Sequence, residues 1–490
     1  MKKLLKNAQI QNTNKWFYIL SAVFISLNAI FLLNDIIYFG FIAFLLAIAW
    51  FGLFAYNKIY YFIIFLTPLS IPLSAFFQLP FDLSLPSEAL MILLTGILTV
   101  KLFTGEKTEK KYLLHPVSIS IGFYLLWMFY TSLTGTMPLV SIKFFLAKIW
   151  FITPIYFFSL ILLKNKKNIY CVLWLYIISF FIVIIYTTLH HLNYGLLDKQ
   201  ASHWVMSPFY NDHTSYGAMI SMYWPVLLVF LLFEKRGFSW KIPVFILFTG
   251  FSIALVLSYS RAAWLSLVLA LILGMFIYWK INFKLLLGTG LLILSLIYFN
   301  RFEIIDRLEK NRQDSSVEFS EHIRSAANIA TDASNVERIN RWKCAIKMFE
   351  EKPILGWGPG TYMFQYAPFQ MSRDKTIIST NFGDWGNAHS EYFSALADSG
   401  IIGLMSFLTM IFFILYTGIL TYHKLNNKNL KLIIWAVLVG LISYLIHGFL
   451  NNFLDTDKAN VPFWTFTAII VSIHISLKRK NPQPGGAEDQ

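Results

Sequence analysis

A chain of 490 residues in which 57% are hydrophobic and only 13% are charged lies outside the range of soluble domains, since ordinary domains carry about 25% charged residues. The hydrophobic residues recur in separate runs, each long enough to cross a bilayer of roughly 30 Å. Composition therefore excludes a soluble enzyme and predicts an all-α, polytopic membrane protein.

The net charge of +14 reflects how Lys and Arg are distributed along the chain. Basic residues fill some short loops, such as the one holding Lys164, Lys166 and Lys167, and are nearly absent from the loops between. This alternation is the positive-inside rule of membrane proteins. The basic residues form no single groove or stripe, so a nucleic-acid partner is not expected. Two separate cysteines, Cys171 and Cys344, predict no disulfide.

Hydropathy predicts about 14 transmembrane helices, within a range of 12 to 14, with both termini in the cytoplasm. The run 16–33 is too long for a signal peptide and lacks a cleavage site, so we interpret it as the first helix. The predicted spans are 16–33, 36–56, 59–78, 87–103, 116–134, 142–163, 168–190, 214–233, 242–259, 262–279, 284–299, 400–422, 432–450 and 461–477.

These spans divide the chain into four parts. Helices 1–11 occupy 1–299, a large and partly helical outer loop occupies 300–399, the last three helices occupy 400–480, and 481–490 is a disordered cytoplasmic tail. Four polar outer elements are expected to converge over the apolar bundle. They are 190–217, the hairpin 258–264, the large loop, and 447–462.

Within the large loop, 300–333 is charged and is interpreted as a cover. A helix is expected from Ser334, because Glu337 three residues later completes a capping box. The apolar stripe predicted for this helix is Ile339, Trp342, Ile346 and Phe349. Pro353 ends the helix, and the sequence ILGWGPG that follows favours a turn.

Several polar residues of the outer elements could carry chemistry. Arg261 lies at the seam between two apolar spans, where an ionisable group is a functional hypothesis, and a snorkelling arginine is the alternative. Arg338 and Arg341 lie one turn apart, so both could bind one phosphate group. A solvated helix face is the alternative for this pair.

His389 could accept a proton from a sugar hydroxyl, which is the task of a general base. A polar residue at a helix start is the alternative. His203, His213 and His447 share the outer face, and we take His213 and His447 as candidate substrate-binding residues. Neither H-x-x-x-H nor C-x-x-C spacing is present to indicate zinc.

Two acidic residues and one lysine leave more than one interpretation open. Asp455 and Asp457 could hold a divalent cation beside a diphosphate, or Lys458 could balance their charge. Lys148, inside the sixth predicted span, could neutralise a buried acid or bind a lipid phosphate.

Three segments resemble the O-antigen ligase/polymerase superfamily. They are SYSRAAWL, the run from Arg338 and Trp342 to PILGWGPGTY, and AHSEYFSALADSGIIGL, in which Ser390 stands where the family commonly has Asn. The resemblance covers Ser258–Met405 and the helices that follow. It implies a metal-independent, inverting glycosyltransfer without a cofactor. The donor would be a glycan on undecaprenyl diphosphate, at the periplasmic face of the bacterial inner membrane.

Carried over by position, Arg261 and Arg338 would bind the diphosphate and His389 would activate the acceptor hydroxyl. Arg341 is a weaker candidate for the same phosphates, and Lys148 a further one. The acceptor is left open among core lipid, a lipid-linked glycan and an exported protein, for a ligase, a polymerase and a protein O-oligosaccharyltransferase respectively. A transporter or flippase for the same lipid, and a silent assembly partner, are alternatives of other classes.

Overall fold

The structure is a computed structural model. It describes residues 56–75, 83–104, 109–233, 237–280, 336–372 and 386–480, with the single residues 22, 23, 26, 295, 299, 375 and 379. Nearly all of the predicted spans 16–33, 36–56 and 284–299, with the cover 300–333 and the tail 481–490, therefore lie outside the described residues. The chain divides into two compact units, Met1–Ile59 and Tyr60–Gln490, and the architecture below is that of the second.

The predicted all-α class is confirmed for the described residues, nine of whose helices are long and apolar enough to cross a membrane. The helices are α3 (Tyr56–Leu66), α4 (Ser87–Phe103), α5 (Lys110–Leu113), α6 (Pro116–Thr134), α7 (Pro138–Ile152), a π-helical turn (Thr153–Phe158), α8 (Ser159–Leu162), α9 (Lys166–Leu192), α10 (His213–Phe233), α11 (Phe238–Leu257), α12 (Arg261–Tyr278), a helix over 336–351, α16 (Tyr362–Gln365), α17 (Glu391–Lys424), α18 (Lys428–His447) and α19 (Asp457–Lys480). Single-turn 3-10 helices lie at Leu73–Ala75, Ala201–His203 and Ala367–Phe369.

The predicted span 59–78 is wrong. Helix α3 already includes residues 57 and 58, and it ends at Leu66. Pro68 follows in a turn because proline removes a backbone donor and disrupts a helix. The chain then forms strand β1 (Ile71–Pro72), which pairs antiparallel with β2 (Ser84–Leu85). After Leu66, a turn and a β-strand thus take the place of the expected continuation of the membrane helix.

The predicted boundary between the large loop and the last helices, at residue 400, is also wrong. Helix α17 begins at Glu391, where the hydroxyl of Ser390 accepts a hydrogen bond from the backbone N–H of Phe393 at 3.4 Å. Gly400 lies inside the helix with φ 67° and ψ −168°, and kinks it. The apolar run that hydropathy detects begins at this kink, whereas the capping residue lies upstream of it.

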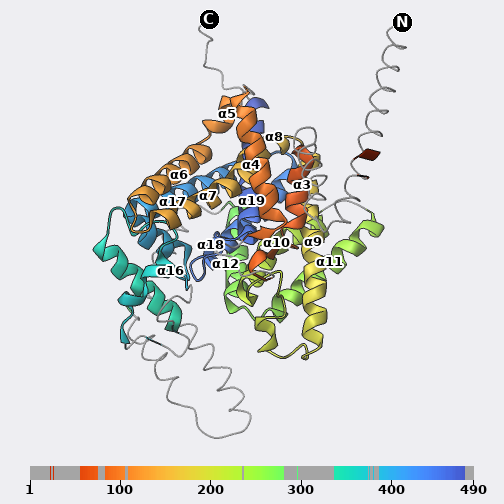
Figure 1. Cartoon of the computed structure of the whole chain (residues 1–490). Coiled ribbons are helices and arrows are strands. Elements are labelled where there is room, and N and C mark those ends of the chain that lie inside the picture. Colours follow the sequence, from red (N-terminus) through yellow and green to blue (C-terminus); the bar gives the residue numbers. More distant parts are fainter. Residues whose placement is uncertain are drawn as a thin grey trace, which may run out of the picture. The chain divides into compact units, whose positions relative to one another are not determined.

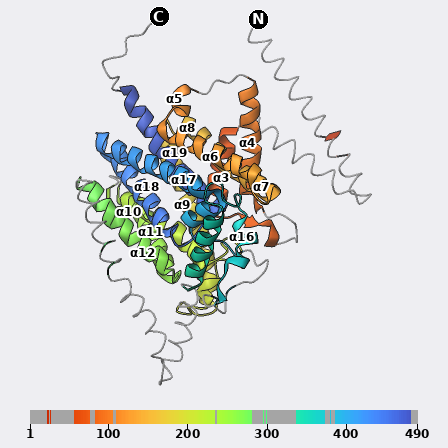
Figure 2. The ribbon, with the colours of Figure 1, turned by 90° about the vertical axis from the view of Figure 1, so that its left-hand side faces the viewer.

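Helices α10, α18 and α19 form the centre of the bundle, and α11 and α12 lie at its periphery. Of the apolar window of α19, 89% is buried, against 22% of that of α11. Helix α18 packs against α10 and α12, while α17 packs against α6 and α19. In Figure 1, the connection 193–212 and the segment 336–372 lie towards the lower end of this unit, with α5 at the upper end. Figure 2 shows segment 336–372 below α17 from a second direction.

Candidate active site

The hairpin between α11 and α12 is held by its own serine and tryptophan side chains. Ser260 is the N-cap of α12 and accepts a hydrogen bond from the Ala263 N–H at 3.4 Å. The Trp264 indole donates to the Leu255 carbonyl at 2.6 Å, which ties α12 to the end of α11. A Cβ at Gly217 of α10 would lie 3.0 Å from the Ser260 Cβ, so the glycine permits α10 to approach the hairpin closely. Arg261 is thereby placed, solvent-exposed, as the first residue of α12.

The helix over 336–351 ends just before Pro353, as predicted. The buried face of this helix is not the predicted apolar stripe, because two residues of that stripe, Ile339 and Ile346, are 46% and 39% exposed. The small residues Cys344 and Ala345 are buried instead. They belong to a cluster that also holds Met348, Tyr362, Tyr366, Ala388 and Ala397. Small side chains on this face leave room for the two tyrosines, whose rings stack 5.3 Å apart.

Arg341 projects from this buried face and already has a carboxylate partner. Its Nε donates to Glu337 at 2.6 Å, one turn back on the same helix, and its guanidinium lies 3.9 Å from the centre of the Tyr366 ring. Arg341 is only 3% exposed. Burial raises the pKa of Glu337, but hydrogen bonds from Ser379 and Arg341 outweigh it and lower the pKa overall. Ser334, the predicted partner of Glu337, lies outside the described residues. This buried ion pair joins two residues of the same helix through the Arg341 Nε, and the role of Arg341 as a phosphate ligand stays a prediction.

Arg338 contacts the connection between α18 and α19. Its Nε donates to the Leu450 carbonyl at 3.2 Å. Trp342, one turn further along, donates to the His389 carbonyl at 3.3 Å. Because residues four apart share a helix face, Arg338 lies on the face of the helix that contacts the His389 backbone.

His389 has an unusual backbone conformation. Its φ is 46°, in the left-handed region that non-glycine residues rarely adopt. The side chain of Asn387 stabilises it by accepting a hydrogen bond from the His389 N–H at 3.0 Å. Such outliers persist only where the surroundings enforce them, and they concentrate at functional sites.

The electrostatic surroundings of His389 keep its imidazole neutral. Burial lowers the pKa of His389 to about 4, with further lowering by the positive charges of Arg338 and Arg341. Burial likewise lowers the pKa of Arg338, although the charge of Asp212 opposes this. At neutral pH, the His389 imidazole is therefore neutral, and the positive charge of Arg338 is close enough to lower its pKa.

The other histidines of the outer elements gather at the start of α10 and the end of α18. The rings of His203 and His213 meet edge to face with centroids 4.1 Å apart, and burial lowers the pKa of His203. His447 lies beside the backbone of Ala262, next to Arg261, and the charge of Arg338 reaches its ring. The outer elements thus bring Arg261, Arg338, His213, His389 and His447 to one end of the bundle.

Lys148 forms an ion pair with Asp455, which is a partly exposed acid and not the buried acid of the prediction. Its Nζ is 3.0 Å from Asp455 Oδ1 and donates to the Leu454 carbonyl at 2.5 Å. Asp457 faces elsewhere and accepts hydrogen bonds from Ser70 and Ser87 at 2.5 and 2.6 Å. Among the described residues, no group of three or more His, Cys, Asp and Glu side chains is arranged to hold a metal ion.

The glycine-rich turn after Pro353 clasps the kink of α17. The Trp357 and Gly358 N–H groups donate to the carbonyls of Ala397 and Asp398 at 3.0 and 2.8 Å. The Asp398 carboxylate accepts from the N–H groups of Gly360 and Tyr362 at 2.9 and 3.1 Å. These amide donors are occupied by the protein itself, so the turn acts as a structural clasp rather than a phosphate cradle.

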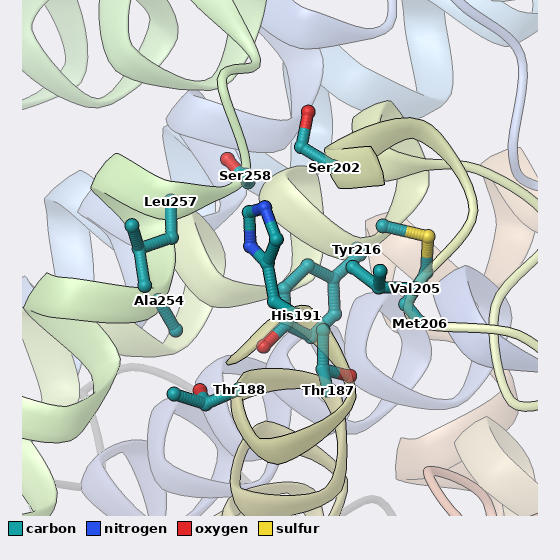
Figure 3. A pocket seen from close by; sticks show the side chains of 10 residues that line it. All are labelled: Thr187, Thr188, His191, Ser202, Val205, Met206, Tyr216, Ala254, Leu257 and Ser258. Carbon is teal, nitrogen blue, oxygen red and sulfur yellow. The ribbon is translucent and has the colours of Figure 1, made fainter. Parts of the chain in front are cut away.

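A small polar cavity lies between α9, α10 and the end of α11 (Figure 3). His191, Ser202 and Ser258 line it, together with the buried hydroxyls of Thr187 and Tyr216. Its volume of about 10 Å³ suits a single water molecule. It is too small for a lipid diphosphate, and neither Arg338 nor His389 lines it.

Two acidic residues of this region were missed in the sequence. Asp212 caps α10 by accepting a hydrogen bond from the Ser215 N–H at 2.7 Å. Its negative charge acts to raise the pKa of both Arg338 and His389. The Asp-x-Thr/Ser pattern of a helix start was a usable signal for it. Asp398 interrupts an apolar segment just before Ser399-Gly400, which was a weaker signal.

Residues 243–408 match a family model described as O-antigen ligase. This segment belongs to the O-antigen ligase superfamily. The resemblance drawn from the sequence is thereby confirmed, and the chain is a multi-pass membrane protein. A comparison with curated proteins finds no match. The O-antigen ligase segment contains Arg261, Arg338 and His389, whereas Lys148, His213 and His447 lie outside it.

Proposed function

We propose that this protein is a membrane glycosyltransferase of the O-antigen ligase/polymerase type. It transfers an oligosaccharide from undecaprenyl diphosphate to an acceptor hydroxyl at the outer leaflet of the bacterial inner membrane. The observation that carries the proposal is that the helix carrying Arg338 contacts the His389 backbone through Trp342, where burial keeps the imidazole neutral by lowering its pKa. A base and a cation in one place are what an inverting transfer to a hydroxyl requires.

In the proposed step, the acceptor oxygen attacks the anomeric carbon of the donor from the face opposite the diphosphate. His389 takes the hydroxyl proton as the new carbon–oxygen bond forms. The bond between the anomeric carbon and the diphosphate oxygen breaks, and its electron pair stays on the lipid diphosphate. Arg338 and the exposed Arg261 are proposed to stabilise that negative charge.

The position of Lys148 argues against the transporter alternative. A flippase for the same lipid would need cationic groups lining a path through the bundle. Among the candidate residues, Lys148 is the one cation that the sequence analysis placed inside a predicted span. Asp455 neutralises its charge. The remaining candidate cations, Arg261 and Arg338, lie at one end of the bundle.

The first test combines purified protein with an undecaprenyl-diphosphate-linked glycan, alone and with core lipid or an acceptor protein. We expect His389→Ala to lower the rate of transfer by about 10²–10⁴-fold. His423→Ala, at the exposed opposite end of α17, serves as the matched control and should leave the rate unchanged.

The product identifies the acceptor. A ladder of longer glycans on the carrier lipid means a polymerase. Transfer only after core lipid is added means a ligase, and transfer only to protein means a protein O-oligosaccharyltransferase. Equal activity of His389→Ala and wild type in every assay would refute the proposed role of His389.

A further inference from the structure

The loop that joins α18 to α19, residues 448–455, contacts two residues of the candidate active site. Its Leu450 carbonyl accepts the hydrogen bond from Arg338. Its Phe453 ring stacks on the ring of His447 with centroids 5.7 Å apart. A shift of this loop would therefore move an acceptor of the Arg338 guanidinium.

Glu391 holds that loop, and it lies two residues after His389. Its Oε1 accepts hydrogen bonds from the N–H groups of Phe453 and Leu454, each at 2.8 Å. The same oxygen accepts from the Tyr444 hydroxyl at 2.7 Å. The backbone N–H of Glu391 also donates to the Gly448 carbonyl at 2.9 Å. One residue thus fixes both ends of the segment that contains Leu450.

We infer that Glu391 is a positioning residue that sets the spacing between Arg338 and His389. It is anchored in the first turn of α17, directly after the His389–Ser390 pair, and it reaches Arg338 through the loop and the Leu450 carbonyl. Lys148 secures the far end of the loop at Leu454 and Asp455. This inference rests on the proposed function, in which Arg338 binds the donor diphosphate.

The three donors that meet at one side-chain oxygen explain why an acceptor of this reach is needed here. An apolar side chain would leave two backbone N–H groups and a hydroxyl without their acceptor, which is costly for partly buried groups. Glutamine keeps an acceptor oxygen at the same reach, whereas aspartate is one methylene shorter. The series Gln, Asp and Ala therefore separates the acceptor and its reach from the mere presence of a side chain.

The test is a double-mutant cycle on the affinity for undecaprenyl diphosphate, measured with purified protein in detergent. We expect Glu391→Ala to weaken binding by about tenfold in the wild-type background and to have no further effect in Arg338→Ala, because interacting residues are not additive. The same loss in both backgrounds, or no loss in either, would overturn the inference. Glu391→Gln should restore most of the affinity and Glu391→Asp little of it, and these variants decide the matter if the alanine variant does not fold.

A second readout does not depend on activity. Hydrogen exchange of the 448–455 amides should be faster in Glu391→Ala than in wild type and unchanged in Glu350→Ala, which alters an exposed glutamate of the 336–351 helix. Unchanged exchange in Glu391→Ala overturns the inference by itself. A wild-type protein that neither binds the diphosphate nor transfers glycan overturns the proposed function instead, and with it the role given to Arg338.

Discussion

At neutral pH the His389 imidazole carries no proton, because burial and the charge of Arg338 hold its pKa at about 4. A base this weak gains strength if the neighbouring positive charge is offset. A bound diphosphate would do so at Arg338, since an opposite charge nearby favours the protonated form of the histidine. The donor would then strengthen the base that acts on the acceptor.

This coupling predicts two different acid limits in the pH profile. The value of kcat/KM, which reports the free enzyme, should fall only as pH drops through about 4. The value of kcat, which reports the donor complex, should fall at higher pH. In Arg338→Ala the limit in kcat/KM should move up toward the ordinary histidine value of about 6.5, because a cation has been removed. Lys343→Ala, a charge change on the exposed face of the same helix, should leave it in place. Coincident limits in wild type would contradict the coupling.

The lowered pKa of His389 also has a consequence for stability. The unfolded chain binds a proton at His389 near pH 6.5, whereas the folded chain binds it only near pH 4. Its contribution to folding is therefore complete above about pH 6.5 and is lost progressively as pH falls toward about 4.

Among the structural elements, the clasp between the glycine-rich turn and α17 joins the helix that carries Arg338 to the one that follows His389. Gly400 adopts φ 67° and ψ −168°, a region that is essentially restricted to glycine. A Cβ there would lie 2.2 Å from the Ile354 carbonyl oxygen. A side chain at position 400 would therefore strain the backbone and clash with the Ile354 carbonyl.

We expect Gly400→Ala to lower the free energy of unfolding by about 3 kcal/mol and to abolish transfer. Thermal unfolding in detergent measures the first effect. The matched control is Gly122→Ala in α6, where a Cβ would meet no atom within 4 Å, and alanine favours the helix by up to about 1 kcal/mol. Equal unfolding temperatures for the two variants would show that the clasp does not hold the fold.

Element boundaries could be predicted where the sequence marks them locally. Helix α4 has its predicted bounds, as does α6, which begins at Pro116. The start of α17 was missed because hydropathy follows the apolar run after Gly400 and not the Ser390 cap. The partner of Arg341 was visible in the sequence as Glu337, at the i, i+4 spacing of helical ion pairs. The partner of Lys148 lies 307 residues away, and no local pattern indicates it.

For the whole molecule, the orientation in the membrane remains a prediction from the distribution of Lys and Arg. It places the 193–212 connection outside and the α17–α18 connection inside. Single cysteines at Gln200 and Asn426, both exposed, test this in a chain whose Cys171 and Cys344 are replaced by alanine. A membrane-impermeant thiol reagent should label Gln200→Cys in intact cells and Asn426→Cys only after the membrane is permeabilised. The reverse pattern would invert the topology and place the candidate active site in the cytoplasm.

The loop 448–455 has a consequence for how the protein is made. Arg261, Arg338 and His389 have all left the ribosome before this loop is synthesised, yet Arg338 and Glu391 find their partners in it. The site is therefore completed only when the last helical pair enters the membrane. We therefore expect a chain that ends at a premature stop codon before residue 448 to contain all three residues and to lack glycan transfer activity.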